Sequence, residues 1–114
     1  MPFIDVRVTT PVSKEQEISI KTLLGQAITV VPGKGEYWLM VGIQPEACLY
    51  FGGSNASSIA YVGVSLFGGE DKEAFAQLTG KICEIMESVL EITPDHVYVK
   101  YDTTMNWGWN GNNF

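Results

Sequence analysis

The sequence predicts an α+β fold in which two β-α-β repeats form a four-stranded mixed sheet with two helices on one face. The chain has 114 residues, of which 46% are hydrophobic and 18% charged, values typical of a globular protein. Strand-like and helix-like patterns alternate in the order β-α-β, twice over. Each helix-like segment has one apolar face and is long enough to join two parallel strands. We therefore expect a single domain over residues 1–114.

The first strand is expected over residues 2–9, where apolar side chains occupy the even positions and one face of the strand is buried. The first helix is expected to begin at Ser13, because Gln16 completes a capping box with it. The apolar stripe of this helix has helical spacing and comprises Ile20, Leu23, Leu24, Ala27, Ile28 and Val31. Pro32-Gly33 is expected to end the helix.

Two central strands are expected to be buried on both faces. The segments Tyr37–Ile43 (YWLMVGI) and Ile59–Phe67 (IAYVGVSLF) are nearly continuous apolar runs, as in strands covered on both sides. Pro45 ends the first of them, and the turn-rich segment 51–58 precedes the second.

The second helix is expected after Gly68-Gly69, where acidic residues suit the positive end of a helix dipole. Its apolar stripe comprises Phe75, Leu78, Ile82, Ile85, Met86, Val89 and Leu90. A turn at Thr93-Pro94-Asp95 leads into an alternating strand over residues 96–101 (HVYVKY). The remaining tail is rich in aromatic residues, glycine and asparagine.

The second face of the sheet is expected to be covered by another subunit. Both helices lie on one face, and the two central strands are apolar on both sides. A single chain would therefore expose a large apolar surface. We expect a symmetric homo-oligomer.

Charge and motifs exclude several classes of function. The net charge of −6 disfavours nucleic acid and anionic membranes as partners. We expect neither a membrane-spanning helix nor a signal peptide, and so a cytoplasmic protein that could leave the cell only by a non-classical route. The two cysteines and one histidine lack metal-ligand spacing, so neither a metal nor a cofactor is expected.

Pro2, directly behind Met1, has two interpretations. Proline has no N–H to give to a sheet, and it is common at the start of an edge strand. Alternatively, removal of Met1 exposes a secondary amine that acts as a catalyst. The dipeptide by itself favours the first interpretation.

The chain resembles the macrophage migration inhibitory factor (MIF) family, within the tautomerase superfamily. The resemblance extends over the whole chain and rests on Pro2, Gly33-Lys34, FGGS at residues 51–54, PDHVYV at residues 94–99 and GWNGNNF at residues 108–114. It implies a trimer that bears active sites between its subunits. It also implies that Met1 is removed and that the Pro2 nitrogen is the base of a keto–enol tautomerase acting on phenylpyruvate-like 2-keto acids.

Such a base must be neutral near pH 7, and burial beside a lysine would lower the pKa of the amine accordingly. The resemblance implies that Lys34 holds the substrate carboxylate. Ser65 and Leu66 match strand positions that line the pocket, with the Leu66 N–H as a donor to the substrate.

Aromatic residues complete the site that the resemblance implies. Trp38, Trp109 and Phe114 match its walls, and Tyr98 matches a tyrosine that a neighbouring subunit contributes. Ordinary packing of the strand or core remains an alternative for Ser65, Leu66 and Tyr98, and an exposed turn lysine remains an alternative for Lys34. His96 is expected to be a solvated turn residue.

Two features depart from the family pattern. Lys100 stands where well-known relatives carry an asparagine, and it would favour anionic substrates or point into solvent. The tail is shorter and carries Trp107. The alternative to an enzyme is a secreted MIF-like cytokine mimic that binds a host receptor.

Overall fold

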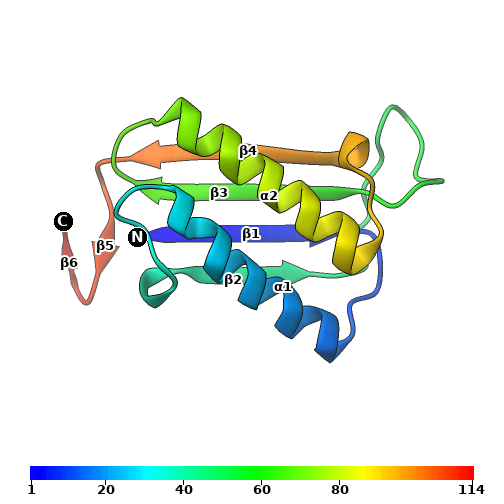
Figure 1. The fold of residues 1–114 in the computed structure, drawn as a ribbon, viewed down its shortest axis with the longest axis horizontal. Coiled ribbons are helices and arrows are strands. Elements are labelled where there is room, and N and C mark those ends of the chain that lie inside the picture. Colours follow the sequence, from blue (N-terminus) through cyan, green and yellow to red (C-terminus); the bar gives the residue numbers. More distant parts are fainter.

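Two helices lie side by side across one face of a four-stranded sheet in the computed structural model, which describes residues 1–114 (Figure 1). The elements are β1 (Pro2–Val8), α1 (Lys14–Ala27), β2 (Met40–Gln44), β3 (Ala60–Phe67), α2 (Lys72–Leu90), β4 (Val97–Thr104), β5 (Gly108–Trp109) and β6 (Asn112–Asn113). The strand order is β2-β1-β3-β4. β1 is parallel to β2 and antiparallel to β3, and β3 is parallel to β4. The predicted fold class is confirmed.

The start of α1 is the predicted capping box. The Ser13 hydroxyl accepts a hydrogen bond from the Gln16 N–H at 3.1 Å, and the Ser13 N–H donates to the Gln16 side chain at 2.9 Å. The regular helix ends at Ala27 and tightens into a 3₁₀ turn at Ile28–Val30. Gly33 follows in the left-handed region, with φ of 77°, which supports its predicted role in ending the helical segment.

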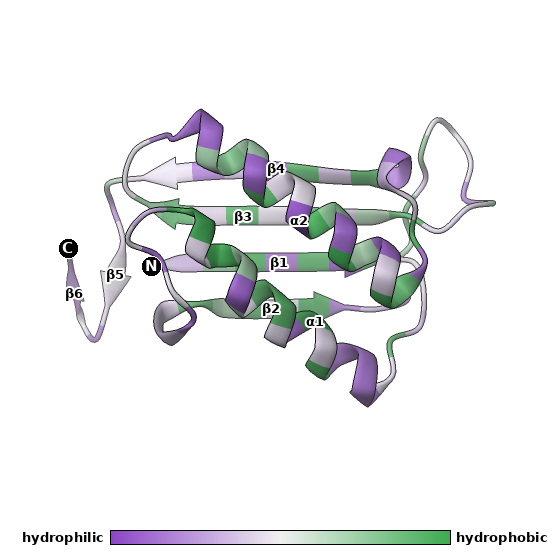
Figure 2. Cartoon of the chain, in the orientation of Figure 1, coloured by the Kyte–Doolittle hydropathy of each residue, from purple (hydrophilic) through white to green (hydrophobic).

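The core lies between the sheet and the two helices. Even-numbered residues of β1 and β3 point into it, as Ile4, Val6 and Val62 do with no exposed surface. Both predicted helical stripes are largely buried against this side of the sheet, and apolar and polar segments alternate along the helices in Figure 2. Neither helix combines the length and the apolar character that crossing a membrane requires.

The prediction of a strand from Tyr37 was wrong. Residues Glu36–Trp38 form a 3₁₀ turn, and β2 begins only at Met40. Tyr37 is 88% exposed, and the Trp38 ring packs edge-on against Trp109 of the C-terminal hairpin, with the ring centroids 5.0 Å apart. The aromatic residues at the start of this run pack on one another outside the sheet, so the apolar run does not mark a strand along its whole length.

Within one chain the central strands are covered on one face only, so burial of their second face by another subunit stays a prediction. Burial alternates strictly along β3, because only its even positions enter the core. The other face carries ion pairs between Asp5 and Arg7 at 3.4 Å and between Lys100 and Asp102 at 3.7 Å. The uncovered face is therefore mixed rather than apolar.

Candidate functional site

Pro2 begins an interior strand, so the interpretation of Pro2 as the start of an edge strand was wrong. β1 lies between β2 and β3, and Pro2 is the register partner of Leu66 on β3. Pairing with β2 starts one residue later, at Phe3 opposite Met40. The sheet tolerates proline here because Pro2 is the first residue of its strand, where no N–H has to be donated to β2.

A cavity of about 520 Å³ opens beside Pro2. Its lining is mostly apolar and includes Met1, Pro2, Phe3, Tyr37, Trp38, Leu39, Met40, Trp107, Gly108 and Trp109. The wall rings contact one another: Trp38 lies between Tyr37 and Trp109, with centroid distances of 5.0 Å to each. The cavity therefore offers several aromatic faces to a flat apolar group.

Lys34 lies by a second, smaller cavity next to the amino terminus. This cavity has a volume of about 260 Å³ and is bounded by Lys34, Leu66, Phe67 and the turn that leads to α2. The Lys34 ammonium donates a hydrogen bond to the Phe67 carbonyl oxygen at 2.7 Å. That bond fixes the cation at the end of β3, beside the start of β1.

Met1 connects the two cavities. It lines the aromatic cavity, and its carbonyl oxygen accepts a hydrogen bond from the Phe67 N–H at 3.1 Å. Burial lowers the pKa of the Met1 amino group below its ordinary value, and the charge and hydrogen bonding of Lys34 lower it further. An amine at this end of the chain therefore loses its proton more readily than an amine in water.

The C-terminal residues close one side of the site. Phe114 contacts the Phe67 ring at a centroid distance of 5.5 Å and stacks nearly parallel to Trp109 at 6.4 Å. The Phe114 N–H donates to the Trp107 carbonyl oxygen at 3.0 Å, which anchors the end of the hairpin. An aromatic row thus extends from Phe67, beside Lys34, to Trp38 in the larger cavity.

The structure brings together five of the residues predicted for the site: Pro2, Lys34, Trp38, Trp109 and Phe114. Leu66 is next to them through its pairing with Pro2, but its side chain is 1% exposed and belongs to the core. Ser65 pairs with Phe3, and its side chain lies on the uncovered face of the sheet.

Tyr98 and Lys100 are not at this site within one chain. Tyr98 pairs with Tyr61 of β3, which is about 16 Å along the strand from Leu66 at the usual rise per residue. The Tyr98 side chain is 64% exposed. Lys100 lies two positions further along the same exposed side of β4, beside Asp102.

Sequence reasoning missed Tyr37 and Phe67. Both belong to apolar runs that were interpreted as buried strands, so nothing set them apart from core residues. Trp107 stood out as a departure from the family pattern but was not assigned to the site. The concentration of aromatic residues near the glycines of the tail is a sequence signal for Trp107 only.

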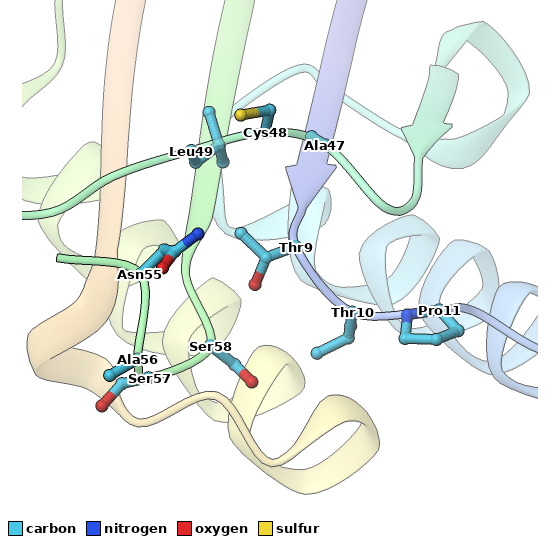
Figure 3. A pocket seen from close by; sticks show the side chains of 10 residues that line it. All are labelled: Thr9, Thr10, Pro11, Ala47, Cys48, Leu49, Asn55, Ala56, Ser57 and Ser58. Atoms are coloured by element: carbon cyan, nitrogen blue, oxygen red, sulfur yellow. The ribbon is translucent and has the colours of Figure 1, made fainter.

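A further cavity, of about 370 Å³, lies at the opposite end of the sheet (Figure 3). It is lined by segment 9–11, which follows β1, and by segments 47–49 and 55–58, and no charged side chain takes part. Its thiol, on Cys48, is free and exposed. This cavity has neither a perturbed amine nor a fixed cation, so the site beside Pro2 is the stronger candidate.

Known proteins match the chain over its whole length. The family model described as macrophage migration inhibitory factor (MIF) matches residues 1–114. The macrophage migration inhibitory factor of Meriones unguiculatus is 26% identical, and the alignment covers 100% of this chain and 99% of that protein.

Solved structures share the fold. The structure of Leishmania major MIF2 has a TM-score of 0.92 and 26% identity, covering 100% of this chain and 97% of that one. A structure of Pt0534 inactivated by 2-oxo-3-pentynoate has a TM-score of 0.83 at 16% identity, covering 96% and 92% of the two chains, and shows likeness of fold alone.

Proposed function

This chain belongs to the macrophage migration inhibitory factor family, and we propose that it is a keto–enol tautomerase whose general base is the nitrogen of Pro2. Membership of the family supports isomerase chemistry of this type. The proposed substrates are phenylpyruvate-like 2-keto acids. In the proposed enzyme Met1 has been removed, so that the nitrogen of Pro2 is a free secondary amine.

The environment of the amino terminus is the observation that carries the proposal. A terminal amine is placed where burial and Lys34 lower its pKa, at the edge of an aromatic cavity. Removal of Met1 would transfer the terminus to Pro2, which lines the same cavity. A prolyl amine is more basic than a primary one, so this lowering would bring it toward neutral pH, where a general base is most efficient.

The proposed reaction is a proton transfer with no other reactant. In the direction from ketone to enol, the Pro2 nitrogen takes a proton from the carbon next to the carbonyl group. The electron pair of that C–H bond forms the enol double bond, and the π pair of the carbonyl group moves to oxygen. The oxygen takes up a proton as the Pro2 nitrogen gives up the one it accepted, which leaves the amine neutral again. The reverse direction returns a proton to carbon.

Lys34 is proposed to bind the substrate carboxylate. Its ammonium is held by a single carbonyl bond, to Phe67, and an ammonium can donate three hydrogen bonds. The Leu66 N–H is proposed as a further donor to the substrate, and Ser65 as a neighbouring part of the lining. Trp38, Trp109 and Phe114 are proposed to contact the phenyl ring.

A homotrimer is proposed to complete the site, with Tyr98 and Lys100 supplied by a neighbouring subunit. Both side chains lie on the uncovered face of the sheet, Tyr98 about 16 Å and Lys100 about 10 Å along the strand from Pro2 of their own chain. Tyr98 is largely exposed, which supports a contact outside its own chain. Lys100 would add a second cation and favour anionic substrates.

Replacement of Pro2 by glycine tests the proposal. Pro2→Gly should abolish the conversion of enolic phenylpyruvate to the ketone, followed by its ultraviolet absorbance, while the melting temperature stays close to that of the wild type. Pro45→Gly, at an exposed position directly after β2, is the matched control and should keep full activity. Undiminished turnover by Pro2→Gly would overturn the assignment of the base.

Chemical labelling gives a second test. 2-Oxo-3-pentynoate, the compound named with the Pt0534 structure, is an electrophilic 2-oxo acid. After removal of Met1, we expect it to add to the N-terminal peptide and to abolish activity in parallel. Mass spectrometry that places the label elsewhere would contradict the proposed role of Pro2.

Receptor binding is the second candidate function. Its support is the similarity, at 25–26% identity over the whole chain, to rodent proteins named macrophage migration inhibitory factor. Two findings would favour this function over the enzyme: the presence of the protein outside cells, and receptor binding that survives Pro2→Gly.

A further inference from the structure

Tyr98 is an exposed side chain with little to hold it in place. The residue is 64% exposed, and its hydroxyl has no hydrogen-bond partner in the chain. Such a side chain would ordinarily move among several rotamers. The one ring that contacts Tyr98 is that of Phe51, at a centroid distance of 5.1 Å and an interplanar angle of 59°.

Phe51, by contrast, is fixed by its backbone. Residues 51–54 form a tight turn in which Phe51 and Ser54 exchange two backbone hydrogen bonds, of 2.8 and 3.1 Å. Gly52 and Gly53 at the tip have φ of 58° and 82°, which glycine adopts without strain. This backbone geometry restricts the position from which the Phe51 side chain leaves the turn.

The Phe51 ring is also held from a second side. It lies 5.3 Å from the His96 ring, and the His96 Nδ1 is 2.9 Å from an Asp95 carboxylate oxygen. That carboxylate in turn accepts a hydrogen bond from the Thr93 hydroxyl. The 3₁₀ turn before β4 therefore supports Phe51, and Phe51 supports Tyr98 at the start of the same strand.

We propose that Phe51 is a positioning residue that holds the Tyr98 ring ready to enter the active site of the neighbouring subunit. The proposal rests on the proposed function, in which Tyr98 completes that site. Fixing one flexible side chain in advance is worth about two- to tenfold in affinity. Phe51 thus acts on substrate binding although it lies at the end of the sheet remote from Pro2 of its own chain.

A double-mutant cycle with steady-state kinetics on enolic phenylpyruvate tests the proposal. Phe51→Leu should raise KM about two- to tenfold with kcat within about twofold of wild type, because it affects ground-state binding. Phe51→Tyr, which keeps the ring, should restore KM. In the Tyr98→Ala background, Phe51→Leu should have no further effect.

Tyr50→Leu is the matched control. Tyr50 is the preceding residue, is 66% exposed and takes part in none of the ring contacts of the chain. The Tyr50→Leu substitution should leave KM and the melting temperature unchanged. An equal rise in KM from Phe51→Leu with and without Tyr98 would show a merely structural role and would overturn the proposal.

Two further measurements separate this proposal from the proposed function. If Tyr98→Ala leaves KM unchanged while Pro2→Gly is inactive, the chemistry at Pro2 stands and the positioning role is wrong. A crystal structure of Phe51→Leu does not depend on activity. We expect the Tyr98 ring to leave its position there, and a ring that stays in place would refute the role of Phe51.

Discussion

Two electrostatic roles are proposed for Lys34, both at the same position. Its ammonium is bound to the Phe67 carbonyl oxygen at 2.7 Å and lies beside the terminal amine, whose pKa it lowers. A cation disfavours protonation of a neighbouring base and attracts an anionic substrate. Loss of Lys34 should therefore affect both substrate binding and the pH dependence of turnover.

We predict that Lys34→Ala raises KM for phenylpyruvate by about ten- to a hundredfold, since hydrogen bonds to charged groups are worth about 1.5–3 kcal/mol. The acid limb of the pH profile of kcat/KM should also move to higher pH, because the amine regains part of its ordinary pKa. Burial still lowers that pKa, so the shift should be incomplete.

Two lysine variants serve as controls. Lys34→Arg keeps the cation and should retain the position of the acid limb. Lys14→Ala removes an exposed lysine that pairs with Glu17 at the start of α1, at 2.7 Å, and should change neither KM nor the pH profile. An acid limb that does not move in Lys34→Ala would contradict the electrostatic coupling to the amine.

Individual site residues were predictable only to a limited extent from the sequence. Pro2, Lys34, Trp38, Trp109 and Phe114 came from the resemblance to a family, and the structure brings them together. Periodicity alone gave none of them, because a site gathers residues from distant segments. Phe67 was missed since its contribution to Lys34 is a backbone carbonyl, which every residue has.

At the scale of elements, Tyr101 links α2 to β4. Its ring stacks on Phe75 with the centroids 4.6 Å apart and the planes within 4°. Its hydroxyl donates to the Phe75 carbonyl oxygen at 2.9 Å and lies 2.8 Å from the Thr79 hydroxyl. Burial raises the pKa of Tyr101, so the folded protein favours the protonated phenol.

We predict that Tyr101→Phe lowers the free energy of unfolding by about 1 kcal/mol at neutral pH, the usual net value of a hydrogen bond. The contribution of Tyr101 is fully present below its ordinary pKa of 10.0 and is lost as the pH rises through the raised folded value. Urea denaturation should therefore show the two proteins converging in stability in the alkaline range.

Tyr50→Phe is the control for this measurement, because Tyr50 is 66% exposed and its hydroxyl has no partner in the chain. It should leave stability unchanged at every pH. A stability difference between wild type and Tyr101→Phe that persists unchanged into the alkaline range would contradict the role of the protonated phenol.

Element types were largely predictable, and the misassignment at residues 37–43 has a clear physical origin. Alternation located β1 and β4, and capping and glycine signals located both helices. A run of apolar residues, however, indicates only that the side chains avoid water. Trp38 achieves this in part by packing on Trp109 of a hairpin distant in the sequence, whereas Tyr37 stays 88% exposed and contacts only the Trp38 ring.

At the scale of the whole molecule, the uncovered face of the sheet was predicted to be apolar and is mixed. Its ion pairs lie within the chain, between Asp5 and Arg7 and between Lys100 and Asp102. The general oligomer prediction followed from apolar composition, and composition does not tell which side of a strand faces the core. Support for assembly now comes from the family and from the exposed Tyr98.

We predict that two defective variants complement each other in mixed trimers. Pro2→Gly lacks the base but keeps Tyr98. Tyr98→Ala keeps the base but lacks the tyrosine. Unfolding and refolding the two together should give activity above the sum of the separately refolded proteins. Sedimentation should show the same trimer in every sample. Activity equal to that sum would indicate that Pro2 and Tyr98 do not act across a subunit boundary.

The position of Pro2 at the head of an interior strand has a practical consequence. Any polypeptide attached ahead of it leaves the sheet at the mouth of the aromatic cavity, between Lys34 and the C-terminal hairpin. An N-terminal affinity tag would therefore block the proposed reactive end while the fold remained intact. Well-folded recombinant protein is thus no guarantee of a working catalyst: specific activity should follow the fraction of chains that have been trimmed by an aminopeptidase.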